Sequence, residues 1–162
     1  MKQRSSPAFS LIELTLALGI AAFCLIAVFG LVPVAVLTNR NATSQTRATN
    51  ITAGVVADLR ATPKTSPPGN ARTSLLYQIP IPANPVTSAT SIPPIFFADS
   101  GTFSTTMQAD SRYRLSITFS PNGPATHTPT YADVKVTWPA AANPATVTPA
   151  GSVEMFAAFD RN

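Results

Sequence analysis

The longest pattern in the chain is an apolar run that follows a short polar start. Between Leu14 and Leu37 no residue carries a charge. An α-helix needs about 20 apolar residues to cross a hydrocarbon core roughly 30 Å thick, and this run is long enough. The run is also apolar on every side of the expected helix, as a membrane span requires. We therefore predict a transmembrane helix here.

Beyond Arg40 the pattern becomes amphipathic. The apolar positions recur at spacings of four, three and four residues, namely Ala48, Ile51, Val55 and Leu59. This spacing places them on one face of a helix, which we call the helix stripe. We expect residues 9 to about 61 to form one long helix, which the Pro- and Gly-rich residues 63–69 bring to an end.

The rest of the chain predicts strands. Three segments alternate apolar and polar residues with a period of two, typical of half-buried strands. Their apolar positions are Tyr113, Leu115, Ile117 and Phe119; Val134, Val136 and Trp138; and Val153, Met155, Ala157 and Phe159. A hairpin is expected where the turn residues 99–101 separate Ile95 from Phe103. A further short edge strand is expected at Leu75, Tyr77 and Ile79.

Antiparallel strands with one polar face need an apolar cover on the other face. The helix stripe can supply this cover. We therefore expect an α+β fold, in which a long N-terminal helix packs its second half on a small antiparallel β-sheet.

The long helix contains one residue that disfavours helical structure. Pro33 has no N–H to donate and its ring clashes with the carbonyl of Phe29, so we expect a kink or local break near Gly30 and Pro33. Two interpretations remain open: a hinge, or a proline tolerated near the end of the membrane span.

One carboxylate interrupts the apolar start of this helix. Burying Glu13 in lipid costs about 2.5–3.5 kcal/mol on insertion scales, so a partner or a function is expected for it. A secretory signal peptide does not fit, because its apolar core is only about 7–15 residues long. The alternative is an ordinary single-pass anchor with a Glu that reaches the membrane interface.

The residues before Glu13 favour the functional interpretation. A basic leader with Lys2 and Arg4 is followed by the small residue Ala8, then by Phe9, with Glu13 fifth after the junction. This arrangement resembles the class III signal of type IV prepilins and of the minor pseudopilins of type II secretion. The chain is also similar to the prepilin-like proteins catalogued as Verru_Chthon cassette protein B, in the FSLIELTLALGI start and the later IFFADSG segment.

The resemblance implies specific roles for these residues. A prepilin peptidase cuts between Ala8 and Phe9, and the new amine of Phe9 is methylated. Glu13 serves assembly by neutralising the Phe9 amine of a neighbouring subunit. The family prefers Gly before the cut, and Ala8 departs from that preference while remaining small.

The resemblance also implies the organisation of the chain and its partners. We expect a prepilin leader at 1–8, a transmembrane and assembly helix at 9–37, an amphipathic half at 38–62, and Pro-rich loops with a pilin-like β domain at 63–162. The N-terminus is expected in the cytoplasm and the β domain outside the inner membrane. The implied partners are the prepilin peptidase, other pilin-like subunits, membrane lipid, and the assembly platform with its ATPase.

Composition argues against other classes of protein. The calculated pI is 9.7 and 11% of residues are charged. Removal of residues 1–8 leaves nine basic against seven acidic side chains, with no basic cluster, so intrinsic nucleic-acid binding is not expected. Cys24 and His127 are the only residues of their types, and they lie far apart in sequence. We expect no catalytic, cofactor or metal site.

These observations favour a structural subunit of a type II secretion or type IV pilus-like filament. The alternative is a membrane-tethered module whose β domain binds a ligand or an envelope component without polymerising. The two hypotheses differ in the mature N-terminus, which is N-methylated Phe9 in the first and Met1 in the second.

Overall fold

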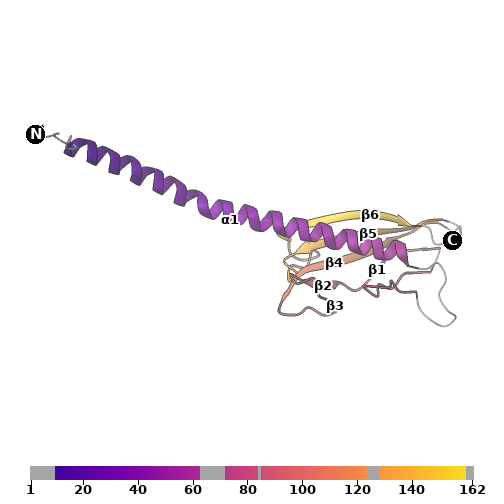
Figure 1. The fold of residues 1–162 in the computed structure, drawn as a ribbon. Helices are drawn as coiled ribbons and strands as arrows, with labels where there is room; N and C mark the ends of the chain where they lie inside the picture. Colours follow the sequence, from indigo (N-terminus) through magenta and orange to yellow (C-terminus); the bar gives the residue numbers. More distant parts are fainter. Residues whose placement is uncertain (1–9, 63–71, 84, 124–127, 160–162) are drawn as a thin grey trace, which may run out of the picture. The chain divides into compact units, whose positions relative to one another are not determined.

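The computed structural model describes residues 10–62, 72–83, 85–123 and 128–159. One helix, α1, runs from Leu11 to Ala61 and is followed by the strands of an antiparallel sheet (Figure 1). The strands are β1 (Thr90–Ser91), β2 (Ile95–Ala98), β3 (Phe103–Ser104), β4 (Ser111–Ser120), β5 (Thr130–Trp138) and β6 (Gly151–Phe159). The protein is thus an α+β protein with its helix packed on a small sheet, which confirms the predicted fold class.

The chain divides into two compact units, Met1–Ala42 and Thr43–Asn162. The boundary lies inside α1, a few residues beyond the division expected at residue 37. Burial explains this position, because every described residue before Ser44 is exposed and Ser44 is the first buried one. The second half of α1 therefore belongs to the β domain.

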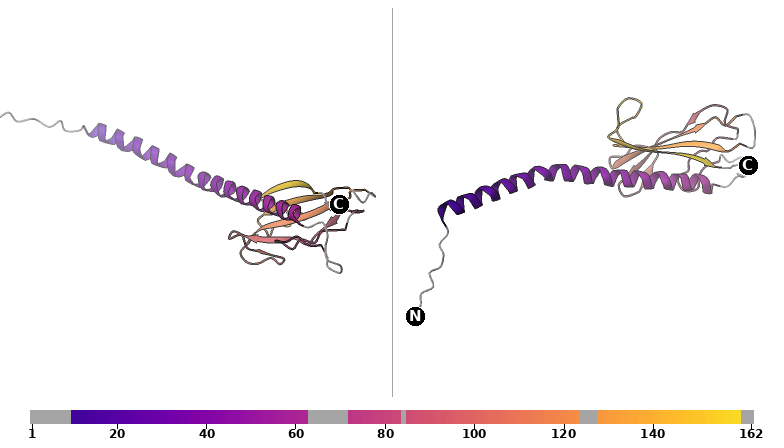
Figure 2. Two further views of the ribbon diagram at one scale, coloured as in Figure 1. Left: turned by 45° about the vertical axis from the view of Figure 1, so that its right-hand side comes forward. Right: turned by 90° about the horizontal axis from the view of Figure 1, so that it is seen from above.

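Helix α1 includes both Gly30 and Pro33 and remains one helix through them (Figure 2). The kink expected there stays a prediction. A proline removes one hydrogen bond from the helical ladder. The backbone on both sides of Pro33 remains helical. A Cβ at Gly30 would meet no atom within 4 Å, so no packing contact within the chain requires a glycine there.

The sheet has the strand order β3-β2-β4-β5-β6, and β1 pairs with the end of β4 beside β2. The predicted hairpin is present as β2 and β3, with Phe97 opposite Phe103. In the three long strands the predicted apolar positions lie in register, for example Ile117 opposite Val134 and Val134 opposite Met155. One face of the sheet is therefore continuously apolar.

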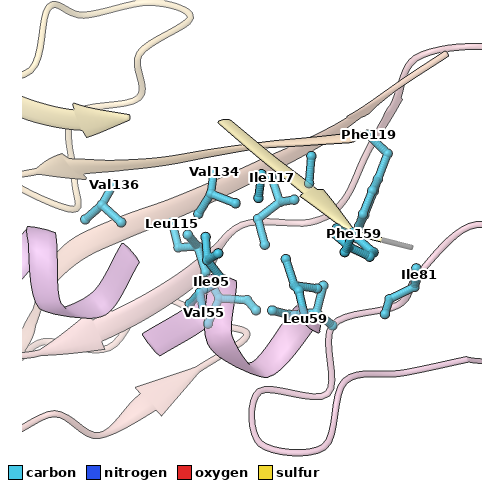
Figure 3. Close-up of a cluster of buried hydrophobic side chains, with 14 of the residues drawn as sticks. Val55, Leu59, Ile81, Ile95, Leu115, Ile117, Phe119, Val134, Val136 and Phe159 are labelled. Atoms are coloured by element: carbon cyan, nitrogen blue, oxygen red, sulfur yellow. The ribbon is translucent and has the colours of Figure 1, made fainter. Parts of the chain in front are cut away.

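The core lies between this apolar face and the second half of α1 (Figure 3). Ala48, Val55 and Leu59 of the helix stripe are at most 1% exposed, and Ile51 is partly buried against the same core. The irregular segment before β1 adds Ile79 and Val86. The helix stripe thus provides the cover that the sheet requires, as predicted.

The short strand expected at Leu75, Tyr77 and Ile79 is not present. Residues 75–77 form a turn, and only an isolated bridge joins Thr73 to Pro80. Leu75 is 69% exposed while Ile79 is fully buried, so the alternation does not match the faces of a strand. The cause is a contact with α1, described below.

Candidate functional site

The first half of α1 presents apolar side chains to its surroundings. Large side chains from Leu11 to Leu37 are 44–81% exposed. Among the described residues, α1 is the one helix long and apolar enough to cross a membrane. Exposed apolar surface of this extent is unfavourable in water but favourable in lipid. The helix is therefore consistent with a single-pass membrane anchor.

Glu13 lies in the first turn of this apolar segment. Its backbone N–H donates to the carbonyl oxygen of Ser10 at 3.0 Å, and the N–H of Leu14 donates to the same oxygen at 3.1 Å. The Glu13 side chain is exposed. A negative charge in the first turn interacts favourably with the helix dipole. The predicted cleavage residues Ala8 and Phe9 lie outside the described residues.

A buried carboxylate that the sequence reasoning missed lies near the end of α1. Asp58 is 8% exposed. Its Oδ1 accepts a hydrogen bond from the backbone N–H of Leu76 at 3.0 Å, and its Oδ2 accepts one from that of Tyr77 at 3.1 Å. These bonds hold residues 75–77 as a turn against the helix. The sequence carries a sign of this buried carboxylate, because Asp58 is an acidic residue next to Leu59 on the otherwise apolar face of the helix.

Tyr77 lies against this carboxylate and against the aromatic hairpin. Its ring makes edge contacts with Phe97 and Phe103, at centroid distances of 5.5 and 5.2 Å. Burial raises the pKa of Tyr77 above its usual value of 10.0, and the charge of Asp58 raises it further. Tyr77 therefore remains a neutral packing residue over the ordinary pH range.

Two guanidinium groups share one carboxylate where α1 meets the turn between β2 and β3. Arg47 Nη1 lies 2.8 Å from Asp99 Oδ1 and also donates to the Asp99 carbonyl oxygen at 2.9 Å. Arg112 Nε lies 3.6 Å from the same Oδ1, and its Nη2 donates to Ser44 Oγ at 3.1 Å. We call Arg47, Asp99 and Arg112 the arginine cluster. It joins residues 52 positions apart in the sequence.

A cavity of about 340 Å³ opens beside this cluster, and we call it the turn pocket. Three elements line it: α1, the β2–β3 turn and β4. The lining residues are Arg47, Asn50, Ile51, Ala98, Asp99, Ser100, Gly101 and Tyr113. Tyr113 is 1% exposed, and its hydroxyl has no hydrogen-bond partner in the described part of the chain. The turn pocket thus combines an apolar lining with a charged rim.

The sheet face opposite the helix carries a second group of charges. Lys135 Nζ lies 2.9 Å from Glu154 Oε2 on the neighbouring strand. Partial burial raises the pKa of the Asp133 carboxyl; the charge of Glu154 raises it further, and Lys135 lowers it. Ionisation of Asp133 is therefore less favourable in the folded protein than in the unfolded chain.

Cys24 and His127 are the remaining residues that the sequence singled out. Cys24 is exposed within the apolar half of α1, and His127 lies outside the described residues. Within the described ranges, no group of three or more His, Cys, Asp or Glu side chains could hold a metal ion.

Comparisons with family models, curated proteins and solved structures gave no match.

Proposed function

We propose that the protein is a pilin-like structural subunit, a minor pseudopilin or pilin. In this proposal it is made as a precursor, cut between Ala8 and Phe9, and assembled into a type II secretion or type IV pilus-like filament. The observation that carries the proposal is the exposed apolar helix of residues 11–37, in which Glu13 is the only ionisable carboxylate. That helix leads directly into the helical cover of an antiparallel sheet.

The free-energy cost of burying charged groups in lipid explains the proposed assembly. Cleavage leaves the amine of Phe9 as a cation at the start of an apolar helix. A carboxylate and an amine are each costly to bury alone, but they compensate each other when paired. In the proposed filament, Glu13 of one subunit pairs with the Phe9 amine of the next. This pairing sets the axial register of the helices.

The partners follow from the same proposal. The prepilin peptidase would process the chain, and the inner-membrane platform with its ATPase would extract subunits from lipid into the filament. Glu13 favours a filament subunit over a simple membrane anchor. A carboxylate near the start of a membrane span costs free energy, and pairing with the amine of a neighbouring subunit would offset that cost.

Intact mass spectrometry of the full chain purified from membranes tests the proposal. The expected mature species has lost residues 1–8 and gained one methyl group on Phe9. Tandem mass spectrometry of the N-terminal peptide locates the cut, because Phe9 is the first residue and carries the methyl group only if the chain is cut between Ala8 and Phe9. A mature species that still begins at Met1 contradicts the proposal.

The second candidate function is a membrane-tethered binding module that does not polymerise. The turn pocket is the observation that favours it, because the lining combines apolar side chains with Arg47 and Asp99. An intact Met1 together with ligand binding by the β domain would support this candidate instead.

A further inference from the structure

We propose that the outer edge of β6 binds an extended, largely apolar segment of a partner polypeptide, which adds a strand to the sheet. This inference goes beyond the proposed function and does not depend on it, because it concerns an edge contained entirely in the β domain. Three observations support it: the unpaired backbone of β6, the contrast with the opposite edge of the sheet, and the side chains that this edge leaves partly covered.

Strand β6 is the last strand of the sheet and pairs on one side only, with β5 (Figure 1). Its nine residues, Gly151–Phe159, pair with β5 one for one and without a register shift. In an antiparallel pair, the backbone N–H and C=O groups of alternate residues point away from the neighbouring strand. Among the described residues, no backbone hydrogen bond reaches these groups of β6 from outside. Such a row of unpaired groups is a template for another extended backbone.

The opposite edge of the sheet is protected against such an addition. It consists of the two-residue strands β3 and β1, and Pro93 and Pro94 lie directly before β2. The register between β2 and β4 also shifts between Phe97 and Ala98. Short strands, prolines and irregular pairing each hinder the addition of a strand. Strand β6 contains no proline and no lysine, so it is the edge at which the sheet can be extended.

The side chains of β6 select an apolar partner segment. Val153 and Met155 face the core but are only partly buried, and Phe156 on the other face is 63% exposed. The Phe156 ring is stacked on that of Tyr131, with the ring centroids 5.7 Å apart. The one charged residue of the strand, Glu154, is already in an ion pair with β5. An added apolar strand would cover the exposed surface on both faces, whereas a charged segment would find no unpaired charge on β6.

A second copy of this chain does not fit this edge. Antiparallel pairing, the kind found between all the described strands, would relate two β6 strands by a two-fold axis perpendicular to the sheet. That axis reverses every direction in the plane of the sheet, so the two helices packed on the two sheets would run in opposite directions. Single-pass anchors in one membrane require helices that start from the same side. The occupant is therefore a different polypeptide.

Hydrogen exchange of the full isotope-labelled chain in detergent micelles, followed by NMR, tests this inference. The probe is an acetylated and amidated peptide with the sequence of β5, Thr130–Trp138, because its side chains already match those of β6 within the sheet. Without the peptide, every second amide of β6 should exchange rapidly. With increasing peptide, these amides should become protected in a saturable manner.

Two N-methylated versions of the peptide are the matched controls. One is methylated at alternate residues and the other at the residues between them, so the two share their side chains but keep N–H donors on opposite edges of the strand. We expect one version to bind like the probe. The other should bind at least about tenfold more weakly, because it loses several backbone hydrogen bonds to β6.

A substitution on β6 provides an independent arm of the test. Ala158→Lys places a charged side chain on the exposed face of the edge strand, so it should weaken binding of the probe. Ala145→Lys makes the same change at an exposed position in the loop before β6, and it should leave the affinity unchanged.

Four results would overturn the inference. The first two are equal binding of the two methylated peptides and β6 amides whose exchange the probe does not slow. The third is an Ala158→Lys variant that binds the probe like Ala145→Lys. The fourth is self-association of the chain that protects the outer β6 amides without any peptide, because it would assign this edge to a second copy.

Discussion

The indole ring of Trp138 lies against Gly151, its directly opposed partner on the neighbouring strand. A Cβ built on Gly151 would come within 2.2 Å of Cζ2 and 2.5 Å of Cε2 of that ring. No side chain fits between them without movement of the indole. The end of the β5–β6 ladder therefore depends on a glycine to accommodate the only tryptophan of the chain.

Gly151→Ala should destabilise the β domain by about 1–3 kcal/mol, as overpacking of a filled site typically does. Urea unfolding followed by Trp138 fluorescence measures the change, since the reporter lies at the altered contact. Ser152→Ala, on the exposed face of the same strand, is the matched control and should unfold like the wild type. A Gly151→Ala variant as stable as this control would show that the indole moves aside without cost.

Asp58→Ala should lower the free energy of unfolding by about 1–3 kcal/mol, because it leaves two backbone N–H groups without their acceptor. Hydrogen exchange should show faster exchange at the Leu76 and Tyr77 amides in particular. Asp110→Ala removes an exposed carboxylate and serves as the control. Unchanged exchange at both amides would mean that the turn at 75–77 does not depend on Asp58.

Asp133→Asn should stabilise the protein slightly at pH 7. The pKa of Asp133 is raised in the folded state, chiefly by burial and then by Glu154. Its protonated form therefore favours folding, a contribution fully present below the unfolded pKa and lost as pH rises through the folded value. At pH 7 Asp133 is ionised in the wild type, so this contribution to stability is lost. The uncharged side chain of the variant does not titrate and has no such loss. At about pH 3, below the usual Asp pKa of about 3.9, the difference should disappear.

Urea unfolding of the wild type and Asp133→Asn at several pH values between 3 and 7 measures this difference. Asp110→Asn is the control for removal of a charge from the surface. A stability difference between wild type and Asp133→Asn that is constant over this range would contradict the prediction.

Glu13→Leu should leave membrane insertion and the β domain intact but reduce subunit assembly. Leucine removes the cost of a carboxylate in lipid, so the variant should reach the membrane at wild-type levels. Without the carboxylate, the Phe9 amine of the adjoining subunit loses its proposed partner. Crosslinking between subunits in membranes measures the effect, and Thr15→Leu, two residues along the same exposed helix, is the control. Wild-type crosslinking by Glu13→Leu would indicate that Glu13 is a tolerated interfacial charge.

The sequence by itself determined the parts of this fold that depend on local periodicity. The period-two pattern at residues 113–119 predicted the core positions of β4, and the helix stripe predicted which face of α1 is buried. The uncharged run from Leu14 to Leu37 predicted the exposed apolar helix. Such patterns are readable because each residue's position along a helix or strand sets the face on which it lies.

Only the tertiary structure decided the features that join distant segments. Alternation at Leu75, Tyr77 and Ile79 predicted a strand, but two backbone N–H groups of this segment donate hydrogen bonds to the Asp58 carboxylate and stabilise a turn there instead. The arginine cluster and the turn pocket likewise require α1 to meet the β2–β3 turn. Local patterns report burial of one face, whereas the partner that buries it is selected by the free energy of the whole packed domain.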